Sequence, residues 1–136
     1  LHDPDGNAIE LNPHHDSAPN LRLTLQVNNY ADSESFYANT LGLKRNAQDA
    51  FLVGASEIVL QHGSVGDVPQ KAIGFRYMTF QVADVVEEHR AILASGGLEG
   101  MAPVRLGDGA YISFVRDPDG NWIEISQRKS ITGSLD

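Results

Sequence analysis

The feature that most constrains the fold of this chain is a strand–helix pattern that occurs twice. Residues 21–27 (LRLTLQV) alternate between apolar and polar side chains, which is the period of a half-buried strand. Residues 28–43 then predict a helix that Asn29 caps. The same order returns in the strand predicted over 75–82 (FRYMTFQV) and in the helix predicted over 83–97. The chain is therefore expected to contain two copies of one supersecondary unit.

Short strands after each helix complete the two units. They are predicted at 43–46, 50–54 and 57–62 in the first half, and at 103–106, 109–116 and 121–126 in the second half. The segment DPDGN predicts a tight turn, with Pro118 at its first corner and Gly120 where a positive φ is needed. Each half is thus expected to be a βαβββ unit, which places the chain in the α+β class.

A second repeat lies at the two ends of the chain. Residues 1–12 (LHDPDGNAIELN) match residues 115–126 (VRDPDGNWIEIS) at seven positions, and Asp3 and Asp117 are 114 residues apart (117 − 3). Because this spacing is nearly the whole chain, residues 1–12 are predicted to be the final hairpin of a preceding copy. The alternative is an N-terminal strand of this chain that is exchanged with a partner subunit. The other predicted parts are a linker at 13–20, one domain at 21–128 with modules 21–62 and 74–128, and a flexible C-terminal tail at 129–136.

Length, charge and composition exclude several classes of protein. A chain of 136 residues is long enough to bury the core of one ordinary domain. A net charge of −8 argues against nucleic acid as a partner, since phosphate binding requires a basic surface. The sequence has no run of about 20 apolar residues, so no membrane span is expected. It also has no cysteine, which fits a reducing compartment and predicts a cytoplasmic protein.

Two runs of the sequence carry a resemblance to a known family. LTLQVNNYADSESFYANTLGLKR is similar to the opening strand and helix of the vicinal oxygen chelate superfamily, and ISFVRDPDGNWIEI is similar to its closing hairpin. This superfamily includes glyoxalase I, bleomycin-resistance proteins and extradiol dioxygenases. The resemblance covers about residues 21–128 and implies a U-shaped mixed sheet with helices outside and a small-molecule cleft inside. It also implies a homodimer, or pairing with a second domain of the family, because extradiol dioxygenases often contain duplicated domains.

Strand alternation predicts which side chains line that cleft. Leucine and isoleucine side chains must cover the helices, so the intervening positions face the opposite way. The residues expected to line the cleft are Arg22, Thr24, Gln26, Val59, Gln61, Tyr77, Thr79, Trp122 and Glu124. Trp122 is the single tryptophan, and its ring either stacks on an aromatic ligand or fills the cavity itself.

The resemblance also implies where a metal would bind. Metal-dependent members carry ligands at the positions of Arg22, Val59, Tyr77 and Glu124, and only Glu124 keeps a good ligand. Arginine is always protonated and has no lone pair to offer. One carboxylate does not hold a divalent ion, because such sites need two or three protein ligands. We therefore expect no metal and no other cofactor in this domain. Glu10 corresponds to Glu124 and is a metal ligand only if an upstream domain supplies the rest of a divalent metal site.

Three functions follow from these expectations. The first is the C-terminal domain of a two-domain glyoxalase- or dioxygenase-like enzyme with a degenerate metal site, which the repeated hairpin favours. The second is a metal-independent binding module of the bleomycin-resistance type that sequesters a small molecule. The third is a metal-free enzyme in which Arg22 holds a substrate anion and Glu124 or Tyr77 moves protons. Because a buried Glu124 without a metal needs another positive charge, an Arg22–Glu124 ion pair is expected.

Overall fold

The structure is a computed structural model that describes residues 1–2, 9, 21–66 and 76–136. The first module consists of β1 (Arg22–Val27), α1 (Tyr30–Ser35), a π-helical turn η1 (Phe36–Thr40), β2 (Phe51–Val53) and β3 (Ser56–His62). The second module consists of β4 (Tyr77–Gln81), α2 (Val85–Ala94), β5 (Leu98–Leu106), β6 (Ala110–Arg116) and β7 (Trp122–Arg128), and α3 (Lys129–Thr132) follows it. A strand, a helix and then further strands thus occur twice, as the sequence predicts.

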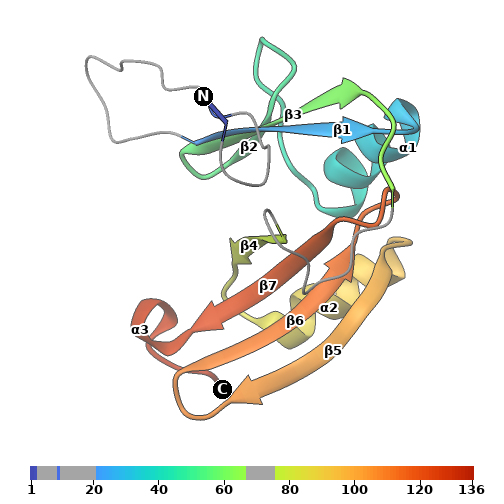
Figure 1. Ribbon diagram of the computed structural model, residues 1–136. Coiled ribbons are helices and arrows are strands. Elements are labelled where there is room, and N and C mark those ends of the chain that lie inside the picture. The colour runs from blue at the N-terminus through green and yellow to red at the C-terminus, as the bar shows by residue number, and fades with distance from the viewer. Residues whose placement is uncertain (3–8, 10–20, 67–75) are drawn as a thin grey trace.

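The strands form two mixed sheets, one in each module (Figure 1). The first-module sheet has the order β1-β3-β2, and the second-module sheet has the order β4-β7-β6-β5. In each sheet the first and last strands of the module run parallel, and the other neighbours run antiparallel. The predicted α+β class is therefore confirmed. Within the described residues no strand pairing joins the two sheets, so they are separate rather than one continuous sheet.

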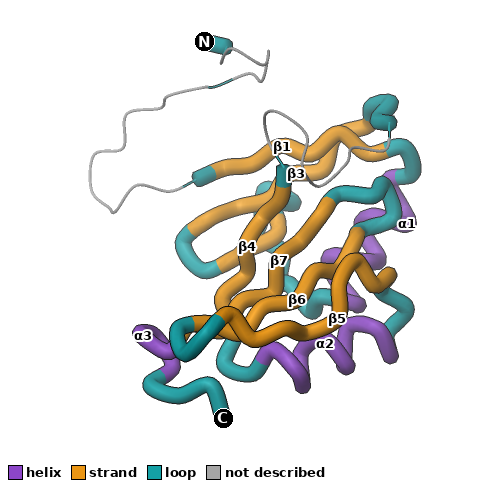
Figure 2. The backbone as a smooth tube through the Cα atoms, turned by 60° about the horizontal axis from the view of Figure 1, so that its bottom comes forward, coloured by secondary structure: helices purple, strands orange, loops and turns teal. Residues whose placement is uncertain are grey.

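The helices α1 and α2 lie along one side of the strands (Figure 2). Asn29 caps α1 by accepting hydrogen bonds from the amides of Ala31 and Asp32, and Asp84 caps α2 by accepting one from Glu87. The strand residues that face the helices are apolar and buried, and they share one core with the helices. This core includes Leu25, Val27, Phe36, Tyr37, Ile58, Leu60, Met78, Val85, Ile92, Ile123 and Ile125. No helix among the described residues is long and apolar enough to cross a membrane.

Several predicted boundaries differ from the structure. The strand predicted at 43–46 is reduced to a single bridge between Arg45 and Phe51. Strand β5 begins five residues before its predicted start of 103, at Leu98 (103 − 98). Two irregularities in its pairing with β6 interrupt the period of two, so alternation does not reveal this strand. The linker at 13–20 and the predicted start of the second module at 74 lie outside the described residues.

The C-terminal residues, which were predicted to form a flexible tail, contain a short helix and a buried side chain. Residues 129–132 form α3, which Gly133 ends in a left-handed conformation with φ of 81°. Gln127 donates a hydrogen bond from Nε2 to the carbonyl oxygen of Ser134 at 3.2 Å. Leu135 is buried, with 7% of its surface exposed. One apolar side chain near the end is thus enough to pack the tail against the domain.

The turn between β6 and β7 connects the second module to the first. The carboxylate of Asp117 is fully buried and accepts a hydrogen bond from the Tyr37 hydroxyl at 2.8 Å. The carboxylate of Asp119 accepts one from the amide of Asn28 at 2.9 Å and another from the Ser33 hydroxyl at 2.8 Å. We refer to these three hydrogen bonds as the inter-module contact. The DPDGN segment is therefore more than a turn, because both of its carboxylates bind the region around α1.

The turn itself holds Asp117 in position for this contact. Oδ1 of Asp117 accepts hydrogen bonds from the amides of Asp119 at 3.0 Å and Asn121 at 2.8 Å. Oδ2 accepts a third from the side-chain amide of Asn121 at 2.9 Å, beside the one from Tyr37. Gly120 occupies the corner with φ of 85°, a conformation that side chains disfavour. The buried carboxylate of Asp117 thus accepts four hydrogen bonds, which offset the cost of its burial.

Because Tyr37 donates in the inter-module contact, we expect the free energy of unfolding to fall at alkaline pH. Burial raises the pKa of the Tyr37 phenol well above its usual value of 10.0, and the nearby Asp117 carboxylate raises this pKa further. Above pH 10 the unfolded chain loses this proton while the folded protein keeps it. The contribution of Tyr37 is therefore complete below pH 10 and falls by up to about 1.4 kcal/mol per pH unit above it.

Urea denaturation at several alkaline pH values tests this expectation. The unfolding free energy of the wild type should fall more steeply above pH 10 than that of Tyr37→Phe, which has no phenolic proton. Parallel curves for the two proteins would show that Tyr37 does not control the alkaline limit.

Candidate functional site

The second-module sheet carries a group of aromatic side chains on the face opposite α2, which we call the helix-free face. Tyr77 and Phe114 meet edge to face with ring centroids 5.2 Å apart. Phe114 and Trp122 meet in the same way at 5.9 Å. Three neighbouring strands position these rings, since Tyr77 pairs with Trp122 across β4 and β7, and Phe114 lies on β6. Such edge-to-face contacts hold the rings in place and leave a firm apolar wall.

Glu124 lies beside this wall and is almost completely buried. It is opposite Thr79 on β4 and Phe114 on β6, so one hydroxyl and one aromatic residue flank it on the neighbouring strands. Arg128 donates from Nη2 to Oε1 of Glu124 at 3.3 Å and from Nε to the Ser126 hydroxyl at 3.0 Å. The side chain of Glu124 is 7% exposed, whereas that of Arg128 is 45% exposed. A positive charge reachable from solvent therefore neutralises a buried negative charge.

The indole of Trp122 is held from two sides. The guanidinium of Arg116 lies over its ring, 5.0 Å from the centroid, while Nε and Nη2 of Arg116 donate to the carbonyl oxygen of Gly120. On β5, a Cβ at position 100 would lie 2.7 Å from the indole, so only glycine fits there. Gly100 and Arg116 thus fix the orientation of the tryptophan on the helix-free face.

A cavity of about 490 Å³ adjoins this face and lies between the two modules. Its volume is within the range of small-molecule sites, roughly 300–1,000 Å³. Of the predicted cleft residues, Tyr77 and Thr79 line it. The remaining lining residues come from both modules and are mostly apolar: Leu21, Leu23, Val53, Gly54, Ser56, Glu57, Ile58, Met78, Phe80 and Gln81.

The other predicted residues fall into two groups. In the first-module sheet, Arg22, Thr24 and Gln26 on β1 lie in register with Glu57, Val59 and Gln61 on β3. In the second-module sheet, Tyr77 and Thr79 lie in register with Trp122 and Glu124. Residues predicted to line the cleft thus lie beside one another within each sheet. However, Arg22, Val59 and Glu124 are not among the residues that line the cavity.

The predicted Arg22–Glu124 ion pair does not form. Arg22 instead binds Glu57 on the adjacent strand, with Nη2 2.8 Å and Nε 3.0 Å from Oε2. Glu124 takes its positive partner from Arg128, four residues later on its own strand. Each carboxylate is thus paired with an arginine of its own sheet. Such an arginine is close enough to reach the carboxylate, so no contact between the two sheets is needed. The predicted metal-free enzyme would therefore draw its two charged residues, Arg22 and Glu124, from two different sheets.

Sequence reasoning missed Arg128 and Phe114 although a signal was present. Strand β7 was predicted to end at 126, two residues too early, and one more step of alternation would have placed Arg128 on the face of Glu124. Phe114 is directly opposite Glu124 in the β6–β7 pairing. Its position follows from the register of the DPDGN hairpin, which the turn type determines.

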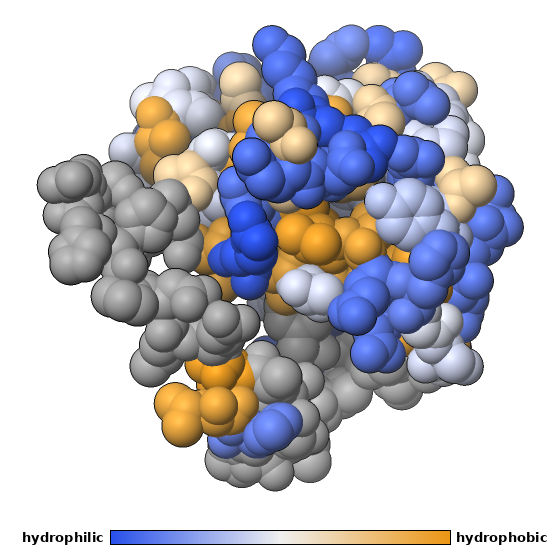
Figure 3. All heavy atoms as spheres, turned by 90° about the horizontal axis from the view of Figure 1, so that it is seen from above, coloured by the Kyte–Doolittle hydropathy of each residue, from blue (hydrophilic) through white to orange (hydrophobic). Residues whose placement is uncertain are grey.

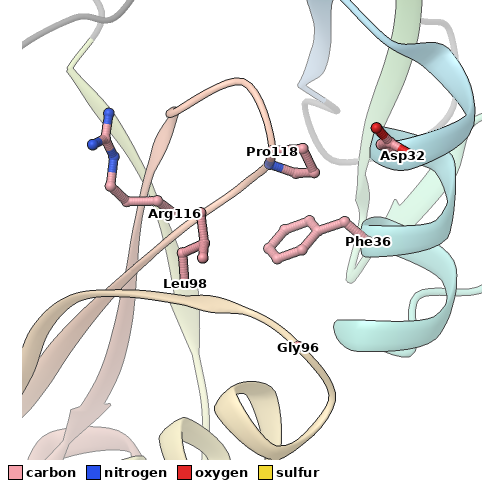
Figure 4. A pocket seen from close by; sticks show the side chains of 6 residues that line it. All are labelled: Asp32, Phe36, Gly96, Leu98, Arg116 and Pro118. Carbon is pink, nitrogen blue, oxygen red and sulfur yellow. The ribbon is translucent and has the colours of Figure 1, made fainter.

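Hydrophobic surface is also present away from this site. A cavity of about 250 Å³ lies where the first-module helix meets the second module, and Phe36 and Pro118 point toward each other there (Figure 4). In another view, hydrophobic side chains gather in a hollow that hydrophilic ones surround (Figure 3). The cavity of about 250 Å³ is lined by no predicted cleft residue, so we place the candidate site at the larger cavity and the helix-free face.

The four positions that bind metal in the family do not suit a divalent ion here. Arg22 and Val59 offer no donor, and the Tyr77 ring is packed against Phe114. Glu124 is the one carboxylate, and Arg128 already engages it. Within the described ranges, no three His, Asp or Glu side chains are grouped closely enough to hold an ion. The residues at these four positions therefore do not form a set of metal ligands.

Comparison with known proteins agrees with this architecture. Residues 21–125 match the model of the Glyoxalase/Bleomycin resistance protein/Dioxygenase superfamily. The chain is 30% identical to a lactoylglutathione lyase of Haemophilus influenzae over 131 residues, which cover 85% of this chain and 96% of the relative. Its structure is similar to that of an integron cassette protein of V. cholerae, with 25% identity, a TM-score of 0.61 and coverage of 84% of this chain and 98% of the other.

The solved structure of another lactoylglutathione lyase shows the same fold. The lactoylglutathione lyase from Agrobacterium tumefaciens is 23% identical, with a TM-score of 0.61 and coverage of 85% of this chain and 97% of the other. Together with the family match over most of the chain, the paired modules and the closing DPDGN hairpin lead to one conclusion. This chain belongs to the Glyoxalase/Bleomycin resistance protein/Dioxygenase superfamily.

Proposed function

We propose that this chain is a metal-independent member of the superfamily that binds a small organic molecule between its two modules. The observation that carries the proposal is the pairing of Glu124 with Arg128. At the one family metal position that keeps a carboxylate, a guanidinium supplies the positive charge that an ion supplies elsewhere. Because Arg128 engages Oε1 of Glu124, an ion bound at this carboxylate would have to displace the guanidinium or share the carboxylate with it.

The neighbouring residues support an apolar ligand with at least one polar group. The cavity is lined by leucine, isoleucine, methionine and phenylalanine, which would cover the body of the ligand. Thr79 and Gln81 lie on the cavity wall and can hydrogen-bond to it. Arg128 lies on the same helix-free face and is half exposed. It belongs to β7, which pairs with the strand β4 that carries Thr79 and Gln81. We propose that it contacts a negatively polarised group of the ligand while it continues to neutralise Glu124.

A metal titration tests the first half of the proposal. Isothermal titration of the wild type with nickel chloride and with zinc chloride is expected to show no stoichiometric binding. Lactoylglutathione lyase activity should stay at the uncatalysed rate with or without either metal. The positive control is the triple variant Arg22→His/Val59→Glu/Tyr77→His, which restores ligands at the family positions and should gain metal binding. Stoichiometric binding by the wild type that Glu124→Gln abolishes would overturn the proposal.

A fluorescence titration tests the second half. Trp122 is the single tryptophan, so intrinsic emission reports directly on the helix-free face. Anilinonaphthalene sulfonate, an aromatic anion, is the probe, and we expect saturable energy transfer from Trp122 to it. Thr79→Phe would fill part of the cavity without adding a second tryptophan and should abolish saturation, whereas Leu106→Ala on the exposed end of β5 should not change it. Equal binding by both variants would show that the probe binds elsewhere.

A further inference from the structure

We infer that the carboxylate of Glu57 selects the ligand of the larger cavity by accepting a hydrogen bond from a neutral hydroxyl or amide N–H group of that ligand. The inference rests on the proposed function, because it concerns the same cavity, and it adds the chemistry of one ligand group. It makes Glu57 a residue that determines specificity and Asn46 a residue that positions it.

Glu57 brings a charge to a wall that is otherwise mostly apolar. Of the described residues that line the cavity, Glu57 alone carries a charged side chain. It lies on β3, opposite Arg22 on β1 and Leu52 on β2, so it is on the central strand of the first-module sheet. Its side chain is 26% exposed. A carboxylate in such a place is costly unless hydrogen bonds compensate it, so its partners explain how it is kept there.

Two residues hold this carboxylate, one at each oxygen. Nε and Nη2 of Arg22 lie 3.0 and 2.8 Å from Oε2, and Nδ2 of Asn46 donates to Oε1 at 2.8 Å. A carboxylate oxygen has two lone pairs, so the two contacts from Arg22 use both lone pairs of Oε2. Among the contacts of the described residues, Oε1 accepts the bond from Asn46 alone. One lone pair of Oε1 is therefore left for a further donor.

The turn at residues 46–50 fixes the orientation of Asn46. Oδ1 of Asn46 accepts hydrogen bonds from the backbone amides of Gln48 at 2.9 Å and Ala50 at 3.0 Å. Asp49 takes a left-handed conformation in this turn, with φ of 60°. Because two backbone donors engage Oδ1, the Nδ2 group of Asn46 is the end that meets Glu57. Through Asn46, the turn thus holds the carboxylate at the cavity wall.

The charges around Glu57 determine which donor suits it. An ionised carboxylate only accepts hydrogen bonds, so the ligand must offer a donor. Arg22 already neutralises the charge of Glu57. An ammonium group would approach the guanidinium as well as the carboxylate, so it would gain little net attraction from the pair. A neutral hydroxyl or amide N–H group makes a hydrogen bond to a charged acceptor without this repulsion.

The ligand is thus expected to present different groups to the two modules. It offers a donor to Glu57 on β3 and a negatively polarised group to Arg128 on β7, with an apolar body between them. A site built around a fixed acceptor discriminates against analogues that lack the donor, because the acceptor is then left unpaired. Glu57 therefore gives the cavity a selectivity that its apolar wall cannot supply.

Three naphthoates that differ at one ring position test the inference by isothermal titration at neutral pH. 6-Hydroxy-2-naphthoate can donate to Glu57, 6-methoxy-2-naphthoate carries the oxygen without its hydrogen, and 2-naphthoate has neither. We expect the wild type to bind the hydroxyl compound about tenfold more tightly than the other two. Glu57→Gln should abolish this preference and leave the affinity for 2-naphthoate unchanged. Glu99→Gln, at an exposed position of β5, should keep the preference.

Asn46→Asp tests the positioning role. An aspartate keeps an oxygen for the amides of Gln48 and Ala50, but it replaces the donor to Glu57 by a second negative charge. The variant should therefore bind 2-naphthoate like the wild type and lose the preference for the hydroxyl compound. A variant that melts cooperatively and retains the full preference would refute the role of Asn46.

The outcomes separate this inference from the proposed function. If the three compounds bind the wild type with equal affinity and Thr79→Phe abolishes their binding, the cavity takes the ligand but Glu57 does not select it, and the inference is overturned. A hydroxyl preference that survives in Glu57→Gln also overturns it, because another group then accepts the hydrogen bond. If none of the compounds binds saturably, or if Thr79→Phe leaves their binding unchanged, the proposed function fails and the inference fails with it.

Discussion

Replacement of Asp117 by alanine is expected to lower the free energy of unfolding by about 3–5 kcal/mol, the largest effect of any single substitution considered for this protein. The Asp117 carboxylate is fully buried and accepts four hydrogen bonds. Without it, the Tyr37 hydroxyl and the Asn121 side-chain amide lose their acceptor inside the protein. Differential scanning calorimetry should show a decrease of roughly 10–15 °C in melting temperature.

Three further variants separate the parts of this effect. Asp108→Ala is the matched control, since Asp108 also lies in a hairpin turn but is exposed, and its change should be within about 0.5 kcal/mol. Tyr37→Phe and Asp119→Ala each remove one side of the inter-module contact and should cost about 1–2 kcal/mol. In a double-mutant cycle, Tyr37→Phe should add little to Asp117→Ala. Full additivity would refute the direct coupling of these two residues.

Replacement of Arg128 by alanine is expected to cost about 2–3 kcal/mol of stability. The carboxylate of Glu124 would remain buried without a positive partner, and an unpaired buried charge is strongly unfavourable. The value is below that for a fully buried pair, because the Arg128 side chain is 45% exposed and solvent screens it. Urea denaturation at neutral pH measures the change directly.

The chain offers a close control for this second prediction. Arg105 binds Asp136 at 3.2 Å, nearly the distance of the Arg128–Glu124 pair, but that aspartate is 86% exposed. Arg105→Ala should therefore leave stability unchanged within experimental error. Adding Glu124→Gln to Arg128→Ala should recover part of the lost stability, since it removes the unpaired charge. A double variant less stable than Arg128→Ala would mean that Glu124 is stabilising without its partner.

Much of the fold could be predicted from local patterns. The period of two correctly identified core residues of β1 and β4 such as Leu25, Val27 and Met78, because one face of each sheet is buried. Leu21 was also expected to cover the helices, but it is 64% exposed. The caps at Asn29 and Asp84 correctly marked the starts of both helices. Strand β5 was predicted too short because its irregular pairing with β6 breaks the alternation. The strand predicted at 43–46 is reduced to the bridge between Arg45 and Phe51, because the strand beside it, β2, has only three residues to pair with.

The candidate site was less predictable, because its contacts join residues distant in sequence. Alternation placed Tyr77, Thr79, Trp122 and Glu124 on one face, but it could not show which cation would reach Glu124. Arg22 was the expected partner, but Arg128 is the observed one. Arg128 lies on the same strand as Glu124, so the pair forms without a contact between the two sheets. Similarly, DPDGN was recognised as a turn, whereas its binding to Tyr37 depends on how the two modules pack.

The inter-module contact has a consequence for the order in which the protein matures during translation. Tyr37 and Asp117 are 80 residues apart, and Ser33 and Asp119 are 86 residues apart. At roughly 5–20 residues per second, the ribosome needs about 4–16 s to add the residues between the first pair. For that time the nascent first helix carries a tyrosine hydroxyl that has no acceptor yet. The amino-terminal half therefore reaches its final stability only when the last hairpin has been synthesised.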